Sequence, residues 1–111
     1  MNAAQGPVIV AGHVRFGPGE IDRLRADMDR VIAGTRAEPG CQVYTYARLL
    51  EDPDTIRIFE IWDSGADLTA HFKTPHMLAW YETLSTAEIL DREVQVYPFT
   101  EVQAIRTYRE G

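Results

Sequence analysis

One stretch, Ile56-Arg57-Ile58-Phe59-Glu60-Ile61-Trp62-Asp63-Ser64, decides the fold of this chain. Apolar and polar residues alternate along its first part, as they do in a β-strand with one buried face. Ser64 then stands where a helix N-cap is expected, and Asp67 follows three residues later as a capping partner. The stretch therefore predicts a strand over residues 55–62 that leads directly into a short helix.

The segments on the N-terminal side of this strand predict a strand, a helix and a hairpin. Residues 8–16 are rich in β-branched residues, and residues 20–35 carry apolar side chains at helical spacing. Residues 41–50 predict a second strand, which pairs with residues 55–62 across a turn at 51–54. The residues expected on one face of the first strand are Val8, Val10, Gly12, Val14 and Phe16.

The segments on the C-terminal side predict a second helix and a last strand. Thr74 and Pro75 suit the N-cap and the first helical position. The buried stripe of this helix is expected to consist of Met77 or Leu78, together with Tyr81 and Leu84. Residues 92–99 predict a fourth strand, and residues 100–108 are a candidate edge strand.

The resulting order, β-α-β-β-α-β, predicts an α+β protein of the ferredoxin-like split β-α-β class, with an antiparallel sheet and both helices on one face. Tyr44, Tyr46, Phe59 and Tyr97 are expected on the helix-free face. An apolar sheet face needs a cover, and a second copy of the chain can supply one. The sequence therefore predicts a homodimer.

Size and charge exclude several classes of function. The 111 residues suffice for a single domain over 1–111, with a core at about 8–99 and a tail at 100–111. A net charge of −6 argues against nucleic-acid partners and anionic membrane surfaces. Cys41 is the sole cysteine, so an intrachain disulfide is impossible. We found neither a signal peptide nor a long apolar run, and we expect a cytoplasmic protein.

Four short motifs, taken in order, resemble the antibiotic biosynthesis monooxygenase family, in particular its quinol monooxygenase-like members. They are Glu38-Pro39-Gly40-Cys41, Phe59-Glu60-Ile61-Trp62, Leu68-x-x-His71 and Thr74-Pro75-His76. The resemblance implies a dimeric α+β barrel with a small hydrophobic pocket in each protomer. It also implies oxygenation of an aromatic substrate by molecular oxygen with no cofactor, whether flavin, haem or metal.

The resemblance assigns His71 as catalytic base or hydrogen-bond partner, and it places His13 in the same pocket. Each histidine also has a structural alternative, a helix-surface position for His71 and a sheet-interface position for His13. Oxygenation of a phenol needs a base that titrates near neutral pH, which is the usual role of histidine. His71 and His76 lie five residues apart with Pro75 between them, so they do not share a helix face for a metal.

Five further residues are assigned to substrate binding. Trp62 and Tyr81 offer flat walls, and Glu60 can orient a neighbouring group. Ile58 and Leu68 stand near the positions where anthrone oxygenases of the family have an asparagine and a tyrosine. This departure argues against an anthrone substrate. In haem-degrading relatives an Asn-Trp-His set occupies the positions of His13, His71 and Tyr81, so haem degradation is not supported either.

The expected function is therefore cofactor-independent oxidation of a quinol or related aromatic phenol. Two alternatives stay open. One is an isomerase-type enzyme for a small carbonyl or phosphorylated signalling compound, which would need cationic residues in its pocket. The other is a non-catalytic dimer that binds a small molecule. Oxygen consumption would distinguish the monooxygenase from the isomerase-type enzyme. Turnover of a substrate would distinguish both enzymes from the non-catalytic dimer.

Overall fold

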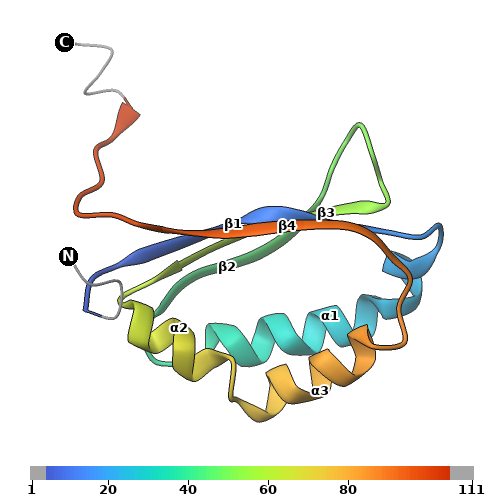
Figure 1. The fold of residues 1–111 in the computed structure, drawn as a ribbon, viewed down its shortest axis with the longest axis horizontal. Coiled ribbons are helices and arrows are strands. Elements are labelled where there is room, and N and C mark those ends of the chain that lie inside the picture. Colours follow the sequence, from blue (N-terminus) through green and yellow to red (C-terminus); the bar gives the residue numbers. More distant parts are fainter. Residues whose placement is uncertain (1–4, 106–111) are drawn as a thin grey trace.

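The computed structural model describes residues 5–105 and shows two layers, a sheet and a set of helices packed on one of its faces (Figure 1). The short helix predicted after Ser64 and the helix predicted to begin at Pro75 are both present, as two separate helices. Within the described residues, no helix is both long and apolar enough to cross a membrane. The elements are β1 (Val8–Phe16), α1 (Glu20–Arg36), β2 (Cys41–Arg48), β3 (Thr55–Trp62), α2 (Gly65–His71), α3 (Pro75–Leu84) and β4 (Ile89–Pro98).

The sheet has the strand order β2-β3-β1-β4, and every neighbouring pair is antiparallel. This arrangement confirms the predicted ferredoxin-like class. β1 is central, and its inward side chains Val8, Val10, Val14 and Phe16 are buried as the alternation predicted. Gly12 shares that face at a point where a Cβ atom would overlap the backbone of β4.

The prediction for β2 was wrong, because Tyr44 and Tyr46 point toward the helices. Tyr44 is 2% exposed, and the two hydroxyl groups hydrogen-bond to each other at 2.8 Å. A tyrosine can be buried when its hydroxyl has a partner, so an alternating pattern that includes tyrosines does not show which face is inside. Phe59 and Tyr97 do lie on the helix-free face and are exposed.

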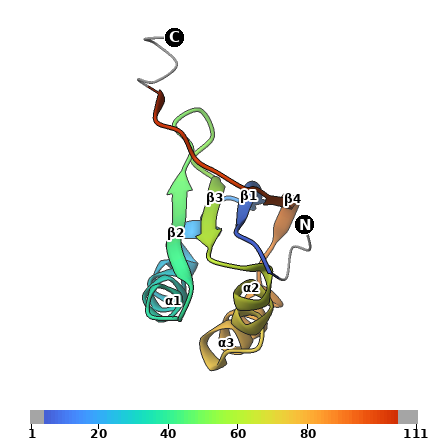
Figure 2. The same cartoon turned by 90° about the vertical axis from the view of Figure 1, so that its left-hand side faces the viewer.

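The helices follow the sequence pattern, with one exception. The apolar stripe predicted for α1 faces the core, with Ile21, Leu24, Met28 and Val31 buried and Ile32 partly buried. Ser64 caps α2 by accepting a hydrogen bond from the Asp67 backbone N–H. In α3 the buried residues are Met77 and Trp80, whereas Tyr81 is 41% exposed. Viewed along the strands, α1 lies beside α2 and α3 in one layer (Figure 2).

The candidate edge strand at 100–108 is absent as far as the structure describes the tail. Residues 100–104 form no strand. Residues 106–108 lie outside the described range.

Candidate active site

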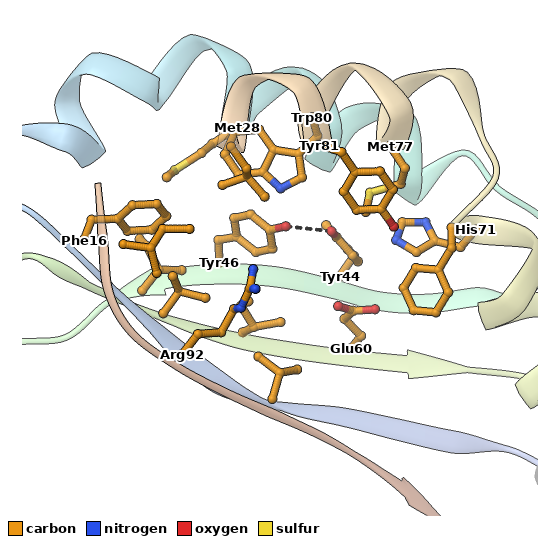
Figure 3. Close-up of a pocket in the computed structure, with 17 residues that line it drawn as sticks. Phe16, Met28, Tyr44, Tyr46, Glu60, His71, Met77, Trp80, Tyr81 and Arg92 are labelled. Carbon is orange, nitrogen blue, oxygen red and sulfur yellow. Dashed lines mark hydrogen bonds between the residues drawn. The ribbon is translucent and has the colours of Figure 1, made fainter. Parts of the chain in front are cut away.

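A cavity of about 200 Å³ lies between the sheet and the helices (Figure 3). Its walls are mostly apolar, and the carboxyl, imidazole and guanidinium groups that line it come from three different elements. Glu60 lies on β3, His71 ends α2, and Arg92 lies on β4. The aromatic wall consists of Phe16, Tyr44, Tyr46, Phe72, Trp80 and Tyr81.

The position of His71 is fixed by the loop after α1. Its Nδ1 lies 2.7 Å from Oε2 of Glu38, and the imidazole is 1% exposed. An ionised carboxylate can only accept hydrogen bonds, so Nδ1 carries the proton and Nε2 keeps its lone pair. Burial lowers the pKa of His71, and the hydrogen bond that the imidazole donates to Glu38 opposes this effect. His71 therefore presents a neutral, proton-accepting imidazole as part of the cavity wall.

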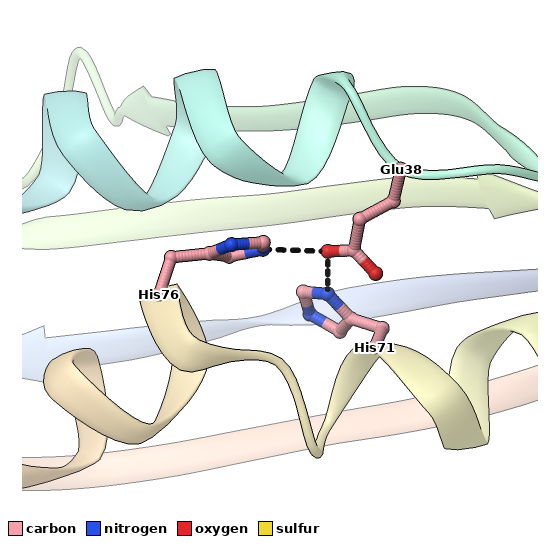
Figure 4. Close-up of side chains that lie close together, drawn as sticks. All are labelled: Glu38, His71 and His76. Atoms are coloured by element: carbon pink, nitrogen blue, oxygen red, sulfur yellow. Dashed lines mark hydrogen bonds and ion pairs between the residues drawn. The ribbon is translucent and has the colours of Figure 1, made fainter.

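Glu38 also holds a second histidine, and the three side chains form a compact cluster (Figure 4). His76 Nε2 lies 2.7 Å from the same Oε2 atom that His71 contacts. One potential ligand atom from each residue lies within 4.8 Å of the other two. Two imidazoles and a carboxylate are a donor set that suits zinc or iron. In the structure these groups satisfy one another through hydrogen bonds.

Glu60 is a buried carboxyl group on the floor of the cavity. Its Oε1 accepts a 2.8 Å hydrogen bond from Trp62 Nε1. Burial raises the pKa of Glu60 to about 7, and the negative charge of Glu38 adds to the rise, whereas the Trp62 hydrogen bond opposes it. The carboxyl group can therefore release or take up a proton near neutral pH.

Tyr44 and Tyr46 form a hydroxyl pair on β2 that faces the cavity. Burial raises the pKa of both phenols, that of Tyr46 to about 12. Both therefore stay protonated at neutral pH and serve as hydrogen-bond donors, not as bases. The Tyr44 ring also packs against His71 in an edge-to-face arrangement, with ring centroids 5.5 Å apart.

The structure brings some of the predicted site residues together and separates others. His71, Glu60, Ile58 and Tyr81 all line the cavity. Trp62 does not line it, because the indole is fully buried behind His71 at a centroid distance of 4.9 Å.

Leu68 is likewise a core residue and does not line the cavity. The placement predicted for His13 was wrong. His13 lies on the opposite face of the sheet, where it contacts Asp91 at 2.9 Å. Because β1 alternates, residues of odd number point away from the helices, and His13 is among them.

Sequence reasoning missed four residues of the site. Tyr44 and Tyr46 were assigned to the wrong face, and Arg92 was not considered. Glu38 was quoted within a motif without a role. Its contact with His71 joins residues 33 positions apart, and no periodic pattern reports such a contact.

The fold and the cavity define a small α+β protein with a largely apolar ligand site between sheet and helices. Residues 7–83 match the antibiotic biosynthesis monooxygenase family. The chain therefore belongs to the antibiotic biosynthesis monooxygenase family.

Two relatives and one more distant structure show how close the similarity is. The chain is 29% identical over 100 residues to the probable quinol monooxygenase YgiN of Escherichia coli, covering 78% of this chain and 92% of YgiN. It is 32% identical over 90 residues to Rv0793 of Mycobacterium tuberculosis, covering 81% and 86%. The solved Rv0793 structure matches with a TM-score of 0.77 at 28% identity, over 88% of this chain and 100% of that one. A conserved protein of Methanosarcina mazei matches with a TM-score of 0.78 at 20% identity, over 88% and 97%, and shows the fold alone.

Proposed function

We propose that this protein is a monooxygenase that oxidises a quinol or related aromatic phenol with molecular oxygen and without a bound cofactor. The observation that carries the proposal is the His71 imidazole in the cavity wall, with Nδ1 held by Glu38 and Nε2 free to accept a proton. Membership of the family and the similarity to a probable quinol monooxygenase support the reaction class.

The cavity restricts the size of the substrate. Pockets for drug-sized ligands measure about 300–1,000 Å³, whereas this one measures about 200 Å³. A ligand of one or two fused rings suits it better than a larger polycycle. Tyr46, Trp80 and Tyr81 can contact the faces and edges of such rings.

The proposed reaction begins when His71 takes the proton of a substrate hydroxyl group. The resulting phenolate is electron-rich, and it gives one electron to molecular oxygen. Superoxide and the substrate radical then combine to form a C–O bond, and the hydroperoxide loses water. A naphthoquinol and molecular oxygen thus yield a hydroxynaphthoquinone and water, and no external reductant is needed. The apolar walls keep bulk water away from the reactive intermediates.

Oxygen uptake by chelator-treated protein, with a panel of quinols and naphthols, tests this proposal. We expect uptake above the autoxidation rate, and a loss of about 10²- to 10⁴-fold for His71→Ala, because general base catalysis contributes that much. Circular dichroism and the thermal midpoint would verify that the variant folds. His13→Ala, on the opposite face of the sheet, is the matched comparison. Wild-type rates for His71→Ala would remove His71 from the mechanism.

One observation favours a second candidate function. Arg92 places a cation in the cavity, as an isomerase-type enzyme for a phosphorylated compound would require. Such an enzyme would turn over substrate without consuming oxygen. The oxygen electrode therefore separates the two functions, provided that product formation is followed in the same samples.

We also propose that the protein forms a homodimer through the helix-free face of the sheet, as a dimeric α+β barrel. Phe59 and Tyr97 are 39% and 49% exposed on this face, although both are large and apolar or aromatic. A second copy would cover them. Size-exclusion chromatography with light scattering should give twice the mass of 12.6 kDa at micromolar concentration. A monomer would contradict this assembly.

A further inference from the structure

Arg92 differs from the rest of the cavity wall because it is the one arginine or lysine among the described lining residues. Its guanidinium makes neither a hydrogen bond nor an ion pair with another side chain in residues 5–105. In Figure 3 this side chain extends from β4 into the cavity toward Tyr46. A guanidinium is planar and only weakly hydrated, so at the edge of an apolar cavity it can attract and orient an anion.

The sheet register separates Arg92 from the proton-accepting end of the cavity. Arg92 lies opposite Val14 of β1, and Glu60 lies opposite Val10. Four residues of a strand span about 13 Å. Arg92 and Glu60 also flank β1 from opposite sides, since they lie on β4 and β3. An arginine side chain can shorten this gap, so a rigid two-ring ligand can meet both ends of the cavity.

We propose that the cavity binds an aromatic acid, with its carboxylate on the Arg92 guanidinium and its hydroxyl group at His71 and Glu60. The hydroxyl end of this pose rests on the proposed function, whereas the anion subsite does not. A planar guanidinium matches a carboxylate through two parallel N–H···O bonds. The single charge of Arg92 neutralises a carboxylate, whereas a phosphate dianion on it would keep a net negative charge in a largely apolar cavity, so we favour a carboxylate.

Three ligands with the same ring system provide the test. They are 6-hydroxy-2-naphthoate, its uncharged carboxamide and 6-hydroxy-2-naphthyl phosphate, with binding measured by calorimetry under nitrogen so that no oxidation occurs. We expect the acid to bind at least about 10-fold more tightly than the amide, because hydrogen bonds to charged groups are the stronger class. An acid-to-amide ratio of one, or tighter binding of the phosphate, would overturn the proposal without any variant.

Variants locate the subsite. Arg92→Gln should weaken binding of the acid by about 10- to 100-fold and weaken binding of the amide much less, because the amide makes only neutral hydrogen bonds. Arg92→Lys should lose less, because it keeps the charge but not the planar fork. Arg25→Gln is the matched control, because Arg25 is an exposed residue that pairs with Asp29 outside this cavity. Equal losses for acid and amide in Arg92→Gln would overturn the assignment.

The carboxylate subsite and the monooxygenase function can be refuted independently of each other. Acid selectivity that depends on Arg92, in a protein that consumes no oxygen with any quinol, supports the subsite and refutes the monooxygenase. Oxygen uptake without acid selectivity would support the monooxygenase and refute the carboxylate subsite at Arg92. In the first case the aromatic acid is the ligand of a different reaction or of a binding protein.

Discussion

Glu60→Gln should make the protein more stable at pH 8, although it alters a buried residue of the site. Glutamine has nearly the same volume as glutamate, and its amide oxygen can still accept the hydrogen bond from Trp62 Nε1. The substitution therefore removes one property, the ability of the side chain to ionise. Any pH-dependent difference between the two proteins reports the ionisation of Glu60.

The direction of the stability change with pH follows from the pKa of Glu60 in the folded and in the unfolded protein. The pKa of Glu60 is about 7 in the folded protein, against a reference value of 4.5. Between these values the folded state binds more protons than the unfolded state, so the free energy of unfolding falls as pH rises through this window. A difference of about 2.5 pKa units corresponds to about 3 kcal/mol. The full destabilisation is present above pH 7 and disappears below about pH 4.5.

Urea unfolding of both proteins from pH 4.5 to 8.5, at one fixed protein concentration, measures the effect. The free energy of unfolding of Glu60→Gln minus that of the wild type should rise by about 3 kcal/mol across the series. Glu20→Gln is the control, and its difference from the wild type should stay flat across this series because its own pH dependence lies below pH 4.5. Hydrogen bonds from Arg23 and Glu88 lower the pKa of Glu20 to about 2, so wild-type Glu20 loses its stabilising effect as pH falls from 4.5 to 2. A Glu60→Gln difference that is flat with pH would refute the reasoning.

Three further predictions follow from the same geometry. Glu38→Gln should lower kcat by about 10- to 100-fold, because Glu38 fixes the tautomer of His71. It should also move the acidic limb of the pH–rate profile to lower pH, because Glu38 raises the pKa of His71, and an unshifted limb would argue that His71 is not the titrating base. Excess Zn²⁺ should inhibit reversibly, because zinc bound at Nδ1 of His71 displaces the proton there and leaves the imidazole protonated at Nε2, where it can no longer act as a base; His76→Ala should weaken this inhibition in a titration followed by chelator rescue. Gly12→Ala should lower the free energy of unfolding by about 1–3 kcal/mol in urea, because its Cβ would overlap the backbone of Glu93.

The sequence predicted the order of the elements well because most of them carry one clear pattern. In β1 the alternation sets valines against His13 and Arg15, so the buried face is unambiguous. In β2 both faces carry side chains that can be buried or exposed, and the pattern left the choice open. In α3 apolar residues occur around most of the helix, so Tyr81 looked as suitable for the core as Trp80.

The site was predictable where it depends on local spacing and not where it depends on long-range contacts. Glu60 and Ile58 alternate on one strand face, and both line the cavity. His71 was found through its resemblance to a family position. The partner that fixes its tautomer, Glu38, lies in a loop whose path depends on the whole fold. Arg92 lies on an exposed edge strand, where an arginine gives no signal of its own.

The Glu60-x-Trp62 pair shows how one strand can serve both the fold and the site. Residues two positions apart on a strand point to the same face, so the sequence places the carboxyl group of Glu60 beside the indole of Trp62. Trp62 is fully buried, and its N–H needs an acceptor, which Glu60 supplies. Glutamine could accept the same bond without the destabilisation above pH 7. The hydrogen bond to Trp62 therefore does not by itself require a carboxyl group at this position, and a carboxyl group that exchanges a proton near neutral pH is compatible with the function proposed above.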